Sequence, residues 1–188
     1  MIRFLTTLPL IAIVTAGLPL PAADPPGWAA APNQFNLFFF LSKDCPISNY
    51  YAPEIKRICA ENNDVRCVLA FPDQQASEAG IKTHLNEYGL SGIDFTIDRN
   101  YSLVSRAAAK VTPEAIVVND RGQIVYRGRI DDRYVTWGKT RREVQSPDLR
   151  RALAEVTAGK PVSVSETKPI GCYIPELSVL RQSQRGKQ

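Results

Sequence analysis

The chain has 188 residues, 44% of them hydrophobic and 22% charged, which is enough apolar sequence for one folded domain and too much for a disordered chain. Lys and Arg number 23 against 19 Asp and Glu, so the net charge is only +4, and this small excess argues against a nucleic-acid partner. A single histidine excludes sites built on several histidines, which leaves the four cysteines as the main candidates for chemistry.

Residues 1–23 have the pattern of a secretory signal peptide. Arg3 is the only charge before Asp24, and an almost wholly apolar stretch follows it. Pro9 and Pro19 argue against one uninterrupted membrane helix, although an uncleaved anchor is the alternative interpretation. Either interpretation predicts an exported domain, periplasmic or secreted, with no membrane contact beyond the signal segment. Disulfides persist in such an oxidising compartment.

From residue 34 onward, continuous apolar runs typical of buried strands alternate with apolar residues at helical spacing. In chain order, these patterns predict a strand at 36–41, a helix at 48–62, a strand at 65–71, a helix capped by Asp73 and ended by Gly89, a strand at 93–97 and a helix at 101–109. Two further apolar runs, 114–118 and 123–127, flank an Asn-Asp-Arg-Gly turn and predict an antiparallel hairpin. The last helix is expected to have Ser146 as its N-cap, Pro147 as its first residue and Gly159 at its end.

This order, β-α-β-α-β-α-β-β-α, predicts an α/β fold with a mixed central sheet and helices on both faces. The first two strands should be parallel and the last two antiparallel. We expect a signal peptide at 1–23, one domain at 24–160 and a C-terminal extension at 161–188. The extension carries Cys172, and its polar end, 181–188, is expected to be disordered.

Cys45 lies where the first strand should end and the first helix should begin, in the stretch SKDCPISN. The free N–H groups and positive partial charge of a helix N-terminus stabilise a thiolate. Pro46 suits the first helical turn, and Ser48 could donate its hydroxyl to the sulfur, whereas the neighbouring Asp44 opposes a second negative charge. The alternative is a small buried cysteine that happens to sit at a junction.

Four stretches together resemble the thioredoxin superfamily, and most closely the exported bacterial redoxin domains of the AhpC/TSA, peroxiredoxin-like type. They are DCPISNYYAPEIKRIC, VTPEAIVVNDRGQIVYRGRIDDRY, SPDLRRALAEVTAGKPV and TKPIGCYIP. The resemblance implies a thioredoxin-like fold, a reactive Cys45 thiol and a cis-proline at Pro113 that shapes the substrate groove. It also implies that the backbone beside Thr112 could pair with an extended substrate segment as an added strand.

The second cysteine of a thioredoxin Cys-x-x-Cys motif is replaced here by Ser48, which cannot resolve a mixed disulfide. Cys172 follows Gly171 beyond the last helix, and one hypothesis makes it the resolving partner of Cys45. The alternative is an unpaired or structural cysteine, because the sequence alone does not fix the connectivity.

Cys59 and Cys67 are predicted at the end of the first helix and in the following strand. They are either a structural disulfide or two small core residues, and neither interpretation makes them catalytic.

We therefore expect an exported thiol–disulfide oxidoreductase. Its Cys45 thiolate would attack a substrate disulfide to form a mixed disulfide, and Cys172 or an external thiol would resolve it. The expected partners are a protein disulfide or a small thiol or peroxide substrate, together with an external reductant. If Cys172 takes no part, the protein would be a monothiol isomerase. One alternative is a thiol peroxidase, in which peroxide oxidises Cys45 to a sulfenic acid that condenses with Cys172.

A non-enzymatic redoxin that carries copper or binds a partner protein is the other alternative. Soft ligands for copper could come from Cys45, Cys172 and His84, although we expect no cofactor. His84 is otherwise expected to be a half-exposed structural residue. The charged segment 127–134 is expected to be a solvated loop with ion pairs.

Overall fold

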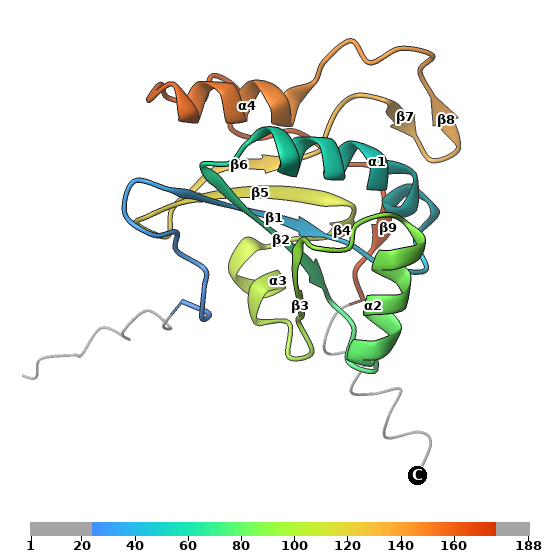
Figure 1. Ribbon diagram of the computed structural model, residues 1–188. Helices are drawn as coiled ribbons and strands as arrows, with labels where there is room; N and C mark the ends of the chain where they lie inside the picture. Colours follow the sequence, from blue (N-terminus) through green and yellow to red (C-terminus); the bar gives the residue numbers. More distant parts are fainter. Residues whose placement is uncertain (1–23, 176–188) are drawn as a thin grey trace, which may run out of the picture.

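The computed structural model describes residues 24–175, so the expected signal peptide and the polar end at 181–188 lie outside the described residues. Its centre is a five-stranded sheet in the order β3-β2-β1-β5-β6 (Figure 1). The strands are β1 (Phe35–Phe40), β2 (Val65–Phe71), β3 (Asp94–Ile97), β5 (Glu114–Asn119) and β6 (Ile124–Gly128). Strand β1 runs parallel to β2 and antiparallel to β5, and β5 and β6 form the antiparallel hairpin. The predicted mixed sheet is confirmed.

Strand β1 is buried on both of its faces, which explains its continuous apolar sequence. Successive side chains of a strand point to opposite faces. Accordingly, Leu37 and Phe39 belong to one apolar core, whereas Phe38 and Phe40 belong to a second core on the other face. Each of these side chains is almost completely buried, which contributes about 1.5–3 kcal/mol per residue to stability.

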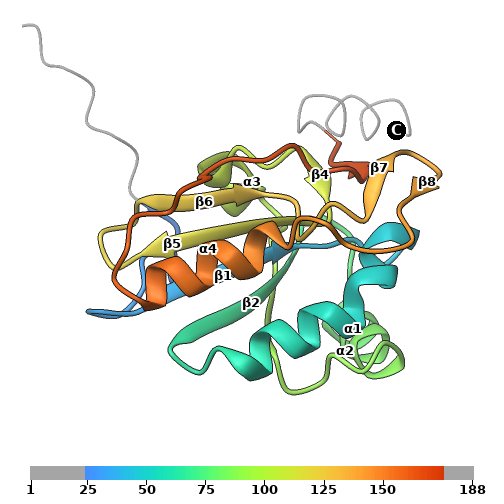
Figure 2. The same ribbon diagram turned by 90° about the horizontal axis from the view of Figure 1, so that it is seen from above.

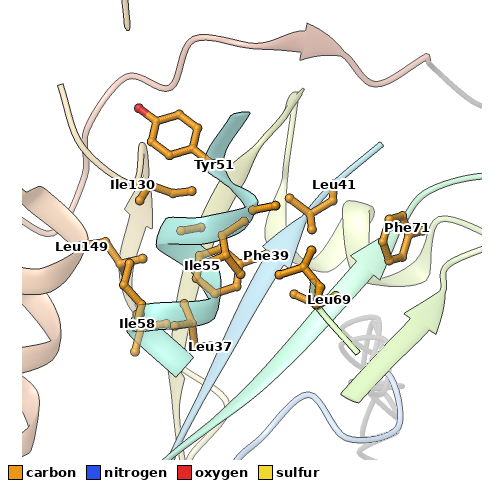
Figure 3. Packing of buried hydrophobic residues seen from close by; sticks show 14 of the residues in the cluster. Leu37, Phe39, Leu41, Tyr51, Ile55, Ile58, Leu69, Phe71, Ile130 and Leu149 are labelled. Atoms are coloured by element: carbon orange, nitrogen blue, oxygen red, sulfur yellow. The ribbon is translucent and has the colours of Figure 1, made fainter. Parts of the chain in front are cut away.

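Helices cover both faces of the sheet, as predicted. They are α1 (Pro46–Glu61), α2 (Glu78–Glu87), α3 (Ser102–Ala107) and α4 (Asp148–Thr157). Helices α1 and α4 lie on the same face (Figure 2), where Ile55 and Leu149 pack into the first core (Figure 3). Helix α3 packs with Trp28 into the second core. Within residues 24–175, no helix combines the length and apolar character needed to cross a membrane.

The start of α2 differs from the prediction. The helix begins after Ser77, whose hydroxyl accepts a hydrogen bond from the backbone N–H of Gly80 at 3.0 Å. The carboxylate of Asp73, the predicted N-cap, accepts hydrogen bonds from the backbone N–H groups of Gln75 and Ala76 instead. Asp73 therefore stabilises a turn ahead of the helix, a role for which aspartate is equally suited.

The start of α4 also differs, because its N-cap is Pro147 rather than Ser146. The Ser146 hydroxyl, which an N-cap would use on the helix backbone, donates to the Asp148 carboxylate at 2.7 Å. At the other end, Gly159 follows the C-cap Ala158 with a left-handed φ of 69°. Gly159 thus ends the helix, as expected.

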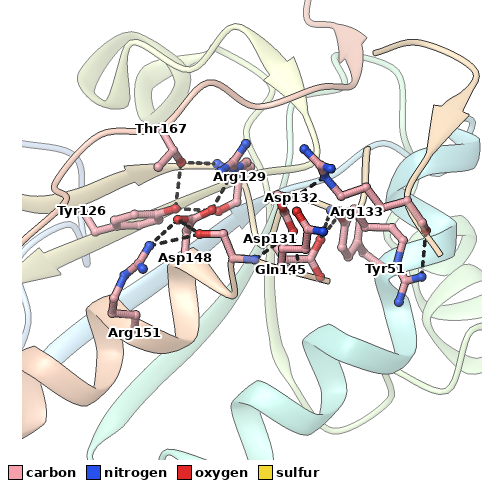
Figure 4. Close-up of polar contacts among 12 residues, drawn as sticks. Tyr51, Tyr126, Arg129, Asp131, Asp132, Arg133, Gln145, Asp148, Arg151 and Thr167 are labelled. Atoms are coloured by element: carbon pink, nitrogen blue, oxygen red, sulfur yellow. Dashed lines mark hydrogen bonds and ion pairs between the residues drawn. The ribbon is translucent and has the colours of Figure 1, made fainter. Parts of the chain in front are cut away.

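The charged segment 127–134 is not the solvated loop that its composition predicts. Asp131 and Asp132 are only 9% and 6% exposed. The Tyr51 hydroxyl donates to Asp131 at 2.5 Å, and Asp132 accepts from the backbone N–H of Gln145 at 2.8 Å (Figure 4). Burial and the bond to Asp131 raise the pKa of Tyr51. These bonds connect the segment to α1 and to the loop before α4.

A short strand precedes the predicted strand at 114–118, which is β5. Strand β4 (Val111–Thr112) is separated from β5 by the Thr112–Pro113 peptide, which is cis. Strand β4 pairs antiparallel with β9 (Cys172–Tyr173), and the two lie side by side in Figure 1. A third small sheet joins β7 (Tyr134–Thr136) and β8 (Lys139–Thr140).

The C-terminal extension runs along the edge of β6 before it reaches β9 (Figure 2). The backbone N–H of Arg127 donates to Ser165 at 2.9 Å, and the N–H of Thr167 donates back to Arg127 at 3.0 Å. The Thr167 hydroxyl lies 2.9 Å from that of Tyr126 and accepts from the N–H of Arg129 at 3.0 Å (Figure 4). These bonds fix the extension to the domain up to Thr167.

Candidate active site

Cys45 is the N-cap residue of α1, and Pro46 is the first residue of the helix. The Cys45 carbonyl accepts a helical hydrogen bond from the N–H of Asn49 at 3.1 Å. Its side chain is buried, with 1% of the residue exposed. The sulfur therefore lies at the positive end of the helix dipole, where a thiolate is favoured over a thiol.

Cys45 is joined to Cys172 by a disulfide that spans 127 positions of sequence, with the two Cα atoms 6.0 Å apart. The Cys45 sulfur also lies 3.1 Å from the carbonyl oxygen of Thr112. Thr112 is in turn the pairing partner of Cys172 in the β4–β9 ladder. The fold thus brings together Cys45, Thr112, Pro113 and Cys172, which are far apart in the sequence. Their catalytic roles stay predictions.

Two polar residues flank the cysteine. Ser48 is buried, and its hydroxyl oxygen accepts from the backbone N–H of Ser42 at 3.4 Å, which supports the loop ahead of Cys45. The expected bond from Ser48 to the sulfur stays a prediction for the reduced form. Asp44 is exposed and forms an ion pair with Lys43 at 2.9 Å. The hydrogen bond from Lys43 to Asp44 raises the pKa of Lys43. The Lys43 cation offsets the negative charge of Asp44, which would otherwise disfavour a thiolate at Cys45.

A groove of about 1140 Å³ lies next to the disulfide, lined by residues 42–44, by one side of α2 and by Tyr173. His84 lines it as well and is 9% exposed, so the expectation of a half-exposed histidine is wrong. The imidazole ring centre lies 4.6 Å from that of Tyr88 and 6.1 Å from that of Phe71. Burial among these rings lowers the pKa of His84.

Glu114 was not singled out from the sequence, although it is buried directly after Pro113. Its carboxylate accepts hydrogen bonds from the backbone N–H groups of Lys110, at 3.0 Å, and Val111. Burial raises the pKa of Glu114 against the opposing effect of these bonds. Glu114 holds the chain that leads into β4. The available signal was an acidic residue at the start of an otherwise apolar strand.

Cys59 in α1 and Cys67 in β2 form a second disulfide, with Cα atoms 5.8 Å apart. Cys59 lies about 20 Å along the helix from Cys45, because each residue advances an α-helix by about 1.5 Å. This disulfide is therefore remote from the candidate site. The described part of the chain contains no group of three or more His, Cys, Asp or Glu that could hold a metal ion.

No family model and no curated protein matches the chain. An uncharacterized conserved protein from Geobacillus kaustophilus is similar in structure, with 21% identity, coverage of 77% of this chain and 78% of its own, and a TM-score of 0.67. A hypothetical protein, SMc02350 from Sinorhizobium meliloti 1021, has 26% identity, coverage of 76% and 79%, and a TM-score of 0.61. A putative thioredoxin from Neisseria meningitidis has 15% identity, coverage of 68% and 75%, and a TM-score of only 0.48, too low to support a functional statement.

Proposed function

We propose that this chain, a member of the thioredoxin superfamily by its fold, is a thiol–disulfide oxidoreductase whose redox-active pair is Cys45 and Cys172. One observation carries the proposal: the Cys45–Cys172 disulfide joins a helix N-cap to the strand that pairs with Thr112. The helix terminus favours the thiolate form of Cys45, which is the nucleophile in thiol–disulfide exchange. Cys172 supplies the second thiol of the reaction, because Ser48 stands at the position of the second cysteine of a Cys-x-x-Cys motif.

The reaction needs two exchanges. First, the Cys45 thiolate attacks one sulfur of a substrate disulfide, so that a Cys45–substrate disulfide forms and the other substrate sulfur leaves as a thiolate. Second, the Cys172 thiolate attacks the Cys45 sulfur, which forms the Cys45–Cys172 disulfide and releases the remaining substrate sulfur. The substrate gains two electrons, the two cysteines lose them, and an external dithiol returns the protein to its reduced form.

We also propose that the protein acts outside the cytoplasm. Two disulfides within one domain are typical of proteins in oxidising compartments. The signal segment predicted at 1–23 supports the same compartment. The reducing partner would then be an exported or membrane-anchored dithiol protein.

The test follows the two sulfurs through one turnover. Reduced protein is mixed with an equimolar protein disulfide such as insulin, quenched with an alkylating agent and digested with trypsin. Cleavage after Lys43, Arg57, Arg66 and Arg151 leaves the four cysteines on four different peptides, so every pairing is visible. We expect the substrate disulfide to be reduced as the Cys45–Cys172 crosslink appears.

Three variants separate the roles. Cys172→Ser should trap a mixed disulfide on Cys45, Cys45→Ser should abolish exchange, and the double variant Cys59→Ala/Cys67→Ala should retain it. Undiminished exchange in Cys45→Ser would rule the proposal out. Faster formation of the crosslink by hydrogen peroxide than by an equal concentration of the protein disulfide would favour the thiol peroxidase.

A further inference from the structure

Strand β9 occupies the surface beside the reactive cysteine. Thr112 pairs with Cys172 and Val111 with Tyr173, and the backbone N–H of Ile174 donates to Lys110 at 2.9 Å. The threonine hydroxyl adds a bond to the Cys172 carbonyl at 3.4 Å. Most of the polar contacts that seat β9 are therefore made by its backbone, and another extended chain could make them as well.

The side chains of β9 contribute little to this docking. Tyr173 is 87% exposed, and Cys172 is held chiefly by its sulfur. The firm attachment of the extension ends at Thr167, where the bonds to β6 stop. Once the disulfide is reduced, the segment 168–175 has only the short ladder and a few apolar contacts to keep it in place.

Gly171 makes the docking selective. A Cβ atom at this position would collide with the carbonyl oxygen of Thr112 and would lie 2.7 Å from its carbonyl carbon and 3.2 Å from the nitrogen of Pro113. The φ angle of Gly171 is not in the left-handed region, so the glycine is required by space and not by backbone conformation. Any chain that follows the same path would have the same steric clash with Thr112 at the residue before its cysteine.

The family resemblance already implies that an extended substrate pairs with the backbone beside Thr112. We propose that this site selects substrates in which a glycine directly precedes the reacting cysteine, and that β9 occupies the site as such a segment does. The inference rests on the proposed function, because a substrate sulfur bonded to Cys45 must lie where the Cys172 sulfur lies now. The substrate strand and β9 then exclude each other on β4. The protein's own extension is a copy of the substrate that the site prefers.

Because the substrate strand and β9 exclude each other on β4, the second thiol–disulfide exchange also releases the product. When the Cys172 thiolate attacks the Cys45 sulfur of the mixed disulfide, the bond from Cys45 to the substrate breaks and the substrate sulfur leaves as a thiolate. The same step returns β9 to its place against Thr112, so the backbone contacts of the substrate are replaced as its covalent bond is lost. The reduced product therefore leaves without a separate dissociation step.

The experiment uses the full chain with Cys172→Ser and two peptides that differ by one Cβ atom. The first peptide is Pro-Ile-Gly-Cys-Tyr-Ile-Pro, the sequence of residues 169–175, and the second has Ala in place of Gly. Each cysteine carries 2-nitro-5-thiobenzoate, whose release reports the attack of Cys45. Rates are divided by those of each peptide with free glutathione, which removes differences in intrinsic reactivity.

We expect the glycine peptide to react at least ~10-fold faster than the alanine peptide, because a steric clash that costs about 1.4 kcal/mol slows the alanine peptide by that factor. Adding Gly171→Ala to the Cys172→Ser chain should accelerate the glycine peptide further, because the chain's own segment no longer competes. Equal rates for the two peptides would overturn the inference, as would an unchanged rate in the Gly171→Ala chain. Oxidised glutathione is the reference substrate: if it also fails to react with Cys45, the proposed function itself fails.

Discussion

The hydroxyl groups of Thr167 and Tyr126 lie 2.9 Å apart, and this contact fixes the C-terminal extension to β6 five residues before Cys172. Five extended residues span at most about 17 Å. Cys172 therefore stays within a short radius of Cys45 even when the disulfide is open. Such a tether keeps the effective concentration of one thiol at the other high.

The variant Thr167→Val tests this tether. Valine keeps the shape of threonine but removes the acceptor for the N–H of Arg129 and the partner of the Tyr126 hydroxyl. We expect the free energy of unfolding to fall by about 1–2 kcal/mol. The backbone bonds between Arg127 and the extension remain, but the weaker anchor should detach more often and so lengthen the free segment. We therefore expect the Cys45–Cys172 disulfide to become about 3- to 5-fold easier to reduce, measured as the redox equilibrium with dithiothreitol.

Thr157→Val is the matched control, because the hydroxyl of Thr157 bonds only to carbonyls of its own helix, at 2.9 and 3.3 Å. This variant should leave the redox equilibrium unchanged. An identical equilibrium in both variants would show that the anchor does not hold Cys172 near Cys45.

The local parts of the fold were predictable because their signals lie within a few residues. The apolar run of β1 and the Cys45–Pro46 junction with α1 are of this kind. The path of the extension is not, because it depends on how Thr167 meets β6 after the sheet has formed. The burial of Asp131 is not predictable for a related reason: the Tyr51 hydroxyl that makes its burial tolerable lies 80 positions away.

Removal of the second disulfide should affect stability and not exchange. Cys59 and Cys67 close a loop of only eight positions, for which the loss of chain entropy on crosslinking is worth about 2.5 kcal/mol. We expect Cys59→Ala/Cys67→Ala to lower the free energy of unfolding in urea by about that amount. Exchange rates of Cys45 should stay within about twofold of the wild type, since this disulfide is remote from the site. A large loss of exchange in a folded variant would contradict the structural role.

Glu114 should make stability depend on pH. Its pKa is raised in the folded state above the ordinary 4.5, mainly by burial, so the unfolded chain releases the proton first as pH rises. The unfolding free energy of the wild type should therefore fall between pH 4.5 and the folded pKa, relative to Glu114→Gln, which does not titrate. Urea unfolding followed by tryptophan fluorescence, from about pH 4 to pH 8, measures the difference.

Glu114→Ala is the companion variant. It removes the acceptor for the N–H groups of Lys110 and Val111, and so should cost about 1–3 kcal/mol at every pH. A stability difference between the wild type and Glu114→Gln that does not change with pH would mean that the Glu114 carboxyl titrates normally.

His84 should give a single, well-resolved titration because it is the only histidine in the chain. Its pKa is lowered from the ordinary 6.5, chiefly by burial, and the acids Glu87 and Asp44 oppose this shift only in part. We expect the imidazole proton signals in NMR spectra to titrate with a midpoint below 6.5.

The lowered pKa of His84 should also make stability depend on pH. Below pH 6.5 the unfolded chain binds a proton that the folded chain does not, so acidification should lower the free energy of unfolding until the folded pKa is reached. His84→Phe keeps a ring against Phe71 and Tyr88 and should lose this pH dependence. A midpoint at or above 6.5 would show that His84 is solvated and that the wall of the groove beside the disulfide is open to water.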